Sequence, residues 1–202
     1  MQLKANTFNN IFKPALFLIL LAPTVWLITN FWLGTLGANP IEHILHTLGE
    51  WALRILLLTL ALSPLRRLLN WTQLVQLRRM LGLFTFYYAS LHLLCYLQFE
   101  QGFSLSGVYT DVIDRPFILF GMLAFLSLIP LAITSTRNKM RQLGRRWKLL
   151  HMLVYPAVIF AVVHFWWLVK ADTTEPLIYA LITCTLLAER LWRFNRGNIS
   201  GA

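Results

Sequence analysis

The feature that most constrains this chain is a series of six apolar segments, each near twenty residues long, joined by short polar connections. A helix needs about 20 mostly apolar residues to cross the hydrocarbon core of a bilayer. The chain is 57% hydrophobic and only 13% charged, whereas soluble domains carry about 25% charged residues. The sequence therefore predicts an all-α integral membrane protein, a six-transmembrane-helix bundle forming one domain over residues 1–202. The expected spans are 14–33, 44–63, 80–99, 116–134, 149–169 and 176–192.

The charged residues are distributed unevenly between the two sides of these spans. With the N-terminus inside, fifteen of the eighteen basic residues fall in inner segments, and Arg115 and Lys170 are the basic residues outside. Lys and Arg concentrate on the cytoplasmic side of membrane proteins, so we expect a multi-pass protein of the bacterial inner membrane with both termini cytoplasmic. The net charge of +10 is then explained by orientation and gives no reason to expect nucleic acid. The basic clusters can also bind anionic membrane lipids.

Smaller features complete the expected membrane domain. The first apolar segment is too long for the core of a signal peptide, so we expect it to be retained as a span. Cys95 and Cys184 lie inside apolar runs and are expected to be buried free thiols. Pro156 lies inside the fifth span, where a proline interrupts the helical hydrogen bonding and should produce a kink. No internal repeat is apparent in the sequence.

Three histidines, His92, His151 and His164, lie within or at the edge of the third and fifth spans. His92 lies thirteen residues after Arg79, and His164 lies thirteen residues after His151, which is about 20 Å along a helix. The third and fifth helices both run from inside to outside. His92 and His164 are therefore expected at a similar depth in the outer half of the membrane, with His151 near the cytoplasmic side.

Ionisable groups at membrane depth are costly and usually functional, and imidazole is a common axial ligand of haem iron. A depth-matched pair of histidines on two helices favours haem ligation. The alternative is that each imidazole hydrogen-bonds a neighbouring helix and has a purely structural role. His43 and His46, at the outer end of the second span, are expected to be structural. Glu50 and Arg54 are spaced to neutralise each other, although a role beside a haem propionate or a quinone is also open.

Several segments, in this order and spacing, resemble the MsrQ (formerly YedZ) family, the haem-binding membrane subunits of bacterial periplasmic methionine sulfoxide reductase systems. The segments are RRMLGLFTFYYASLH (78–92), RPFILFG (115–121), LAITST (131–136), LGRRWKLLHMLVY (143–155) and PLIYA (176–180). The resemblance covers nearly the whole chain. More distantly, the chain is similar to the ferric-reductase transmembrane domain that NADPH oxidases share.

The resemblance implies an electron-transfer subunit with b-type haem, one or two per chain, rather than a catalytic subunit. It implies electrons from the quinone pool or a cytosolic flavin reductase, a periplasmic molybdenum-containing acceptor called MsrP, and an association with FMN. By position, His92 and His164 match an outer haem-ligand pair, and His151 matches the fifth-span member of an inner pair. The third-span partner of His151 would lie near Arg78 or Arg79, where this sequence has no histidine.

Two other functions remain open at this stage. One is a transmembrane ferric or other metal reductase, which would use the same haem but a different acceptor. The other is a transporter or a membrane scaffold without redox chemistry. The sequence contains no GxGxxG dinucleotide fingerprint, so the electron donor is expected to be another molecule. The acidic outer segment 100–115 is expected to help to dock the acceptor, through Asp111 and Asp114.

Overall fold

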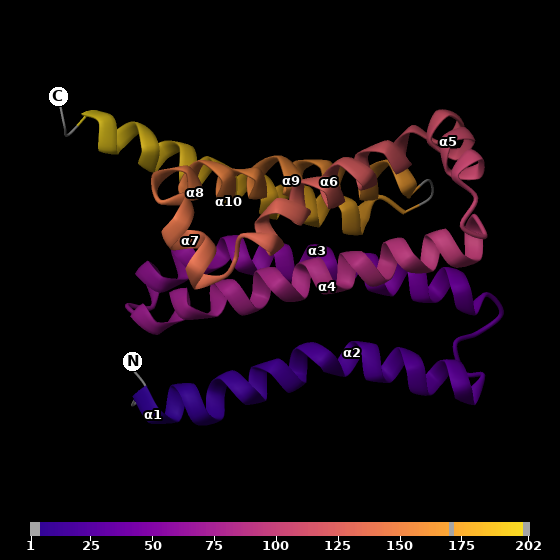
Figure 1. Ribbon diagram of the computed structural model, residues 1–202, viewed down its shortest axis with the longest axis horizontal. Helices are drawn as coiled ribbons and strands as arrows, with labels where there is room; N and C mark the ends of the chain where they lie inside the picture. The colour runs from indigo at the N-terminus through magenta and orange to yellow at the C-terminus, as the bar shows by residue number, and fades with distance from the viewer. Residues whose placement is uncertain (1–4, 170–171, 200–202) are drawn as a thin grey trace. The chain divides into compact units, whose positions relative to one another are not determined.

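The structure, a computed structural model, describes residues 5–169 and 172–199, and within these ranges it contains helices and no strand (Figure 1). The predicted all-α fold is confirmed. Lys4 and Lys170, which contribute to the predicted topology, lie outside the described residues. The chain divides into two units, Met1–Val108 and Tyr109–Ala202, which are described separately. The helices are α1 Ala5–Thr7, α2 Lys13–Leu33, α3 Pro40–Leu68, α4 Arg78–Cys95, α5 Leu105–Asp114, α6 Pro116–Ile133, α7 Arg137–Leu143, α8 Arg145–Leu150, α9 Val154–Leu168 and α10 Thr174–Ile199.

Five helical stretches among the described residues are long and apolar enough to cross a membrane: Phe8–Leu33, Pro40–Leu68, Thr72–Glu100, Pro116–Ile133 and Arg145–Leu168. Each contains one predicted span to within one residue. The sixth predicted span forms most of α10, a helix of 26 residues, which at 1.5 Å per residue is about 39 Å long. Charged residues in its second half make α10 less apolar than the other five: Glu189, Arg190, Arg193 and Arg196. The chain is a multi-pass membrane protein.

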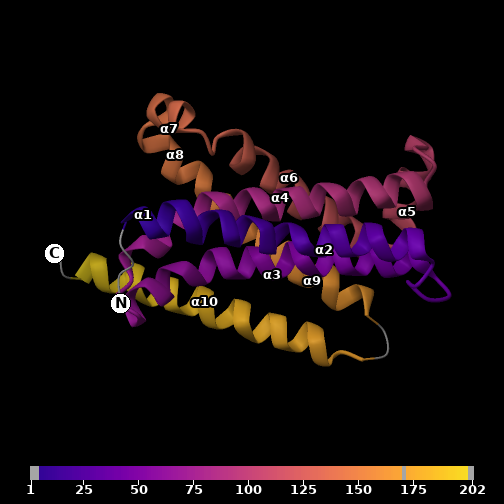
Figure 2. The same cartoon turned by 90° about the horizontal axis from the view of Figure 1, so that it is seen from below.

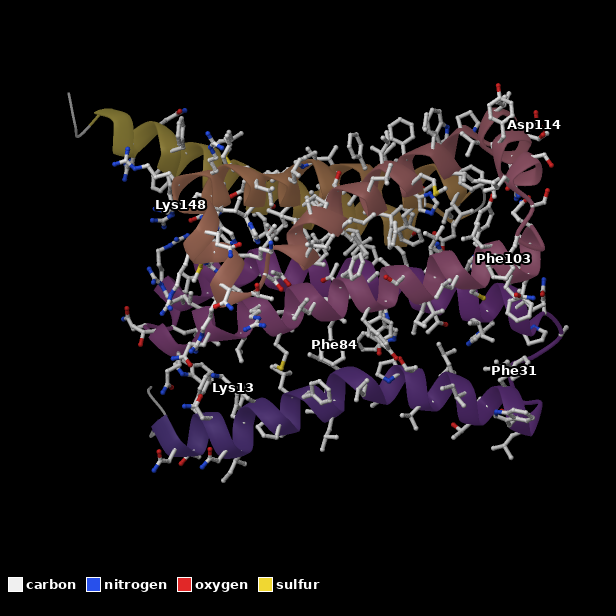
Figure 3. All side chains as sticks on the ribbon, viewed as in Figure 1. Lys13, Phe31, Phe84, Phe103, Asp114 and Lys148 are labelled. Carbon is white, nitrogen blue, oxygen red and sulfur yellow. The ribbon has the colours of Figure 1, made fainter. Side chains whose placement is uncertain are left out.

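In the first unit, α3 and α4 lie side by side in both views (Figures 1 and 2), and α2 packs against them. Their contact is made by buried leucines and aromatic rings from all three helices. Phe84 points from α4 towards α2 (Figure 3), where its ring centroid lies 5.1 Å from that of Phe17. Lys13 and Phe31 lie at opposite ends of α2 in the same view. The core residues include Leu20, Leu27, Leu48, Ile55, Leu62, Leu81, Phe84 and Tyr88.

A fully buried tyrosine joins α4 to α2. Tyr88 has 0% of its surface exposed, and its hydroxyl donates a 2.6 Å hydrogen bond to the carbonyl of Leu20. The Tyr88 hydroxyl oxygen also accepts a 3.2 Å hydrogen bond from the Thr24 hydroxyl. A buried hydroxyl without a partner would be costly, so this pair of hydrogen bonds allows a polar group to stay inside the helical core.

In the second unit, α6 packs along α9, and α10 packs on α9. Small residues line the α9 face: Ala157 and Val158 are each 0% exposed. Large apolar side chains on the outer faces of the helices, such as Trp166 and Leu181, are exposed, as expected for surfaces that meet lipid. The N-terminus of α10 follows Asp172, whose carboxylate accepts a 2.9 Å hydrogen bond from the Thr174 N–H. Hydrogen bonding from the Thr174 side chain, and then from its N–H, lowers the pKa of Asp172.

The fifth span is interrupted where the sequence predicts a kink. Helix α8 ends at Leu150, a 3-10 turn covers His151–Leu153, and α9 begins at Val154. Pro156 has no N–H for the carbonyl of Met152, so regular α-helical bonding cannot pass through this point. The predicted interruption is confirmed. It places His151 in the turn and His164 in the helix beyond it.

Three features of the fold differ from expectation or were not predicted. The connections contain two short helices, α5 and α7, and α7 begins after Thr136, whose hydroxyl accepts the Lys139 N–H. Gly144 joins α7 to α8 at φ +51°, a backbone conformation that other residues rarely adopt.

The prediction of two buried thiols holds for Cys95 but is wrong for Cys184, which is exposed on α10. An apolar run does not reveal which residues of a lipid-facing helix point outwards.

The tie between α4 and α2 can be tested with Tyr88→Phe, which keeps the ring and removes the hydroxyl. We expect a loss of about 1 kcal/mol, the usual net value of one hydrogen bond, seen as a lower Tm of the detergent-solubilised protein. Tyr87→Phe removes a hydroxyl from the neighbouring position and is the matched control. Equal Tm values for the two variants would show that the Tyr88 hydroxyl does not stabilise the unit.

Candidate functional site

His92, on α4 in the first unit, is held by a hydrogen bond to the facing helix α3. Its Nδ1 atom lies 2.9 Å from the carbonyl oxygen of Leu45. A carbonyl can only accept a hydrogen bond, so Nδ1 must carry the proton. In the neutral ring, Nε2 is then the nitrogen with the lone pair, the form in which imidazole binds a metal.

The residue one turn after Leu45 on α3 is Gly49, and it lies directly against the His92 ring. A Cβ atom added to Gly49 would be 3.2 Å from both Cε1 and Nδ1 of His92. Such a separation is tighter than nine in ten real Cβ contacts. The ring therefore occupies space that is available because residue 49 has no side chain.

His164, on α9 in the second unit, is held in the same way by α6. Its Nδ1 atom lies 2.7 Å from the carbonyl oxygen of Phe117, and its ring centroid is 5.8 Å from the Phe117 ring. A Cβ added to Gly121, one turn after Phe117, would lie 2.9 Å from Nδ1 and 3.0 Å from Cε1. A side chain at Gly121 could not be accommodated without a shift of the ring or the helix.

The two units thus contain the same local arrangement. In each, a histidine donates Nδ1–H to a carbonyl 47 residues earlier in the chain, and a glycine follows the acceptor residue by one helical turn. Leu45 and Phe117, Gly49 and Gly121, and His92 and His164 are each 72 residues apart. No repeat is apparent in the sequence because few other residues are identical at this offset.

His151 differs from the other two. Its Nδ1 atom lies 3.1 Å from the carbonyl of Trp147 in the preceding helix α8, and its ring stacks on the Trp147 indole with a centroid distance of 3.8 Å. The indole N–H donates a 3.0 Å hydrogen bond to the carbonyl of Thr134, at the end of α6. The position 72 residues before His151 is Arg79, not a histidine.

The remaining polar residues of the spans fit structural roles. His43 and His46 are exposed, and the His43 ring lies 6.0 Å from the Trp26 ring. Glu50 and Arg54 form a 2.8 Å ion pair along α3. The expected pairing of Glu50 with Arg54 is confirmed, and the guanidinium also lies over the Trp51 ring.

The chemistry of His92 and His164 fits that of axial metal ligands. Metal-binding histidines usually donate their second ring N–H to a carbonyl, a carboxylate or water, which fixes the tautomer and the orientation of the ring. Both residues have this partner. The histidines were found from the sequence, but Gly49 and Gly121 were missed. A signal was available, because a glycine within a helix costs about 1 kcal/mol relative to alanine and often marks a close approach.

Comparisons with known proteins identify related sequences. A family model described as "Ferric reductase like transmembrane component" matches residues 48–162, a region that contains both glycines and His92 and ends just before His164. A protein of Xanthomonas campestris pv. campestris (strain B100) is 47% identical over 187 residues, covering 90% of this chain and 86% of that protein. A protein of Rhodospirillum rubrum is 49% identical over 180 residues, covering 89% of this chain and 86% of its own length.

Both relatives carry the name "Protein-methionine-sulfoxide reductase heme-binding subunit MsrQ". A relative of Xanthomonas oryzae pv. oryzae (strain MAFF 311018) with the same name is 44% identical over 196 residues and covers 94% of this chain. No solved structure matches the chain significantly.

The role of the ion pair on α3 can be decided with Glu50→Leu, Arg54→Leu and the double variant. Glu50→Leu leaves a guanidinium that cannot lose its proton in a membrane span, at a cost of up to about 3 kcal/mol. Arg54→Leu should cost less, because the carboxylate can take up a proton. We expect the double variant to regain most of the Tm lost by Glu50→Leu. A double variant that is fully stable but inactive would instead give the pair a functional role.

Proposed function

The chain belongs to the MsrQ family of ferric reductase-like transmembrane proteins, and from this premise we propose that it is the membrane b-type cytochrome of a methionine sulfoxide reductase system. In this role it passes electrons from the quinone pool or a cytosolic flavin reductase across the inner membrane. The acceptor is the periplasmic molybdenum-containing reductase MsrP, which repairs oxidised periplasmic proteins. FMN is a further candidate cofactor, as the family resemblance implies.

The observation that carries the proposal is the recurring hydrogen bond from a histidine Nδ1–H to a carbonyl of the facing helix. The hydrogen bond holds each imidazole through Nδ1. The other ring nitrogen, Nε2, then keeps the lone pair with which an imidazole binds iron. We assign His92 and His164 as the axial ligands of one haem. A haem held in this way supplies one-electron exchange between the two sides of the membrane.

His151 is the ligand candidate for a second haem. Its ring is fixed by the Trp147 carbonyl and by stacking on the indole, so it too has the Nδ1–H tautomer. The corresponding position on the third span is Arg79, which cannot ligate iron. A second haem would therefore use His151 with a ligand of another kind, and we propose one bis-histidine haem as the minimum.

The orientation in the inner membrane follows from the charges within each unit. Lys13 lies at one end of α2, and the Lys148 end of the second unit lies opposite Asp114 (Figure 3). Lys and Arg mark the cytoplasmic side, so we propose that the ends of the units with Lys13 and Lys148 face the cytoplasm. Both termini are then cytoplasmic, and the acidic α5 segment faces the periplasm.

An ion pair distinguishes the two carboxylates that are expected to dock the periplasmic acceptor. The Arg115 guanidinium donates two hydrogen bonds to the carboxylate of Asp111, which offsets that charge. Asp114 is exposed at the end of α5. Of the two carboxylates expected to dock the partner, Asp114 is therefore the better candidate.

A second candidate function is a metal reductase that delivers electrons to a ferric chelate. The description of the matching family model favours this candidate. It requires the same ligands and differs in the acceptor at the outer face.

The ligand assignment predicts the haem content of single variants. His92→Ala and His164→Ala should each lose the bis-histidine haem, because an iron with one protein ligand binds far more weakly. His43→Ala and His46→Ala are matched controls and should keep it. The measurement is the absorption spectrum and the haem-to-protein ratio of purified protein. Wild-type haem content in either His92→Ala or His164→Ala would refute the assignment. A lower haem-to-protein ratio in His151→Ala than in the wild type would indicate a second haem.

The acceptor can be identified with reduced protein in proteoliposomes. We expect rapid reoxidation by added MsrP and slow reoxidation by a ferric chelate. Asp114→Lys should slow the reaction with MsrP severalfold at low salt, Asp114→Glu should not, and the difference should shrink at high salt because exposed charges are screened. Fast reoxidation by the chelate with no response to MsrP would favour the metal reductase.

A further inference from the structure

We propose that Gly49 and Gly121 are positioning residues for the haem ligands: the missing side chains expose the helix carbonyls that orient His92 and His164. This inference rests on the proposed haem ligation. It concerns what sets the geometry and the donor strength of the ligands, which the family comparisons do not address.

The geometry of an α-helix explains how a glycine at this position makes room for an imidazole ring at the acceptor carbonyl. The N–H of residue i+4 bonds to the carbonyl of residue i, and each Cα–Cβ bond tilts towards the N-terminus of the helix. A helical side chain therefore covers the turn that precedes it. A side chain at position 49 would cover the carbonyl of Leu45, and one at position 121 would cover that of Phe117.

The added-Cβ distances place the histidine rings in this uncovered space. The contacts are 3.2 Å for Gly49 with His92 and 2.9 Å for Gly121 with His164, and in both cases the nearest ring atoms include Nδ1, the hydrogen-bonding nitrogen. A Cβ would push on the same atom that must reach the carbonyl. His164, whose ring has the tighter contact with the added Cβ, also makes the shorter hydrogen bond, 2.7 Å against 2.9 Å for His92.

Two other residues of the chain show that the arrangement is specific. His151 takes its carbonyl from Trp147 in the preceding helix α8, so it needs no glycine on a facing helix. Gly82, on α4 like His92, has no atom within 4 Å of an added Cβ among the described residues. A glycine that contacts a histidine ring is thus a feature of the two assigned ligands of one haem.

The arrangement has a consequence for the redox chemistry. A hydrogen bond from Nδ1–H to a carbonyl raises the basicity of an imidazole ligand, and a more basic ligand favours ferric over ferrous iron. Axial ligands and their hydrogen bonds are among the means by which a protein tunes a haem potential. Weakening either hydrogen bond should therefore raise the midpoint potential.

The test uses the full chain carrying Gly49→Ala or Gly121→Ala, with Gly82→Ala as the matched control. For each purified protein, the haem-to-protein ratio, the midpoint potential, the low-spin ferric EPR spectrum and the Tm are measured. We expect both test variants to show a more positive potential and altered EPR g values, because the ring is turned or its hydrogen bond is lengthened. The shift should be larger for Gly121→Ala, and Gly82→Ala should match the wild type.

A purely structural role for the glycines would lower Tm and leave the potential and the g values unchanged, which would overturn the proposal. Loss of haem from test variants that accumulate normally in the membrane would support it, since the ring has then left the iron. If Gly121→Ala does not accumulate, the result for Gly49→Ala decides whether the proposal holds. The His92 ring needs to move by only a few tenths of an ångström to admit that Cβ. Failure of the ligand assignment itself is seen separately, as wild-type haem content in His92→Ala or His164→Ala.

Discussion

A hydrogen bond between a histidine side chain and the backbone of a facing helix is the interaction on which this account depends. Inside a bilayer there is no water to satisfy a polar ring, so an imidazole must find its partners in the protein. His92 and His164 find one at a helix carbonyl, with Nδ1 to oxygen distances of 2.9 Å and 2.7 Å. This contact meets the cost of placing the ring in the membrane, and it also selects the tautomer that ligates iron. Under the proposed haem ligation, the same contact serves both the stability of the helix pair and the orientation of the ligand.

The same contact explains the packing of each pair of helices. A carbonyl on a helix surface is partly covered by the side chain one turn later, and at Gly49 on α3 and Gly121 on α6 the missing side chain leaves room for an imidazole ring beside the carbonyl. Close approach of small residues is a common way for membrane helices to associate. Here the small residue admits a side chain of the partner helix rather than its backbone. The recurrence at an offset of 72 residues means that each unit orients one histidine by the same means.

The sequence was sufficient to predict the helical membrane fold, the positions of five membrane-length helices and the interruption before Pro156, because hydrophobic length and the missing proline N–H act locally. It also identified the three histidines as candidate ligands, since ionisable groups in apolar runs are rare, and that assignment stays a prediction. The acceptor carbonyls of Leu45 and Phe117 could not be predicted, because every residue has a carbonyl and the facing turn depends on how the helices pack. The roles of Gly49 and Gly121 depend on that same packing. The exposure of Cys184 was missed for a related reason: an apolar run does not indicate which face of a helix meets lipid.

Bis-histidine ligation of iron is tested directly by low-temperature EPR of the oxidised, purified wild-type protein, recorded with its haem-to-protein ratio. Two imidazoles on one iron predict a low-spin ferric signal from at least one haem per chain, in a protein that does not bind carbon monoxide when reduced. A high-spin signal with ready carbon monoxide binding, or a protein isolated without haem, would contradict the account.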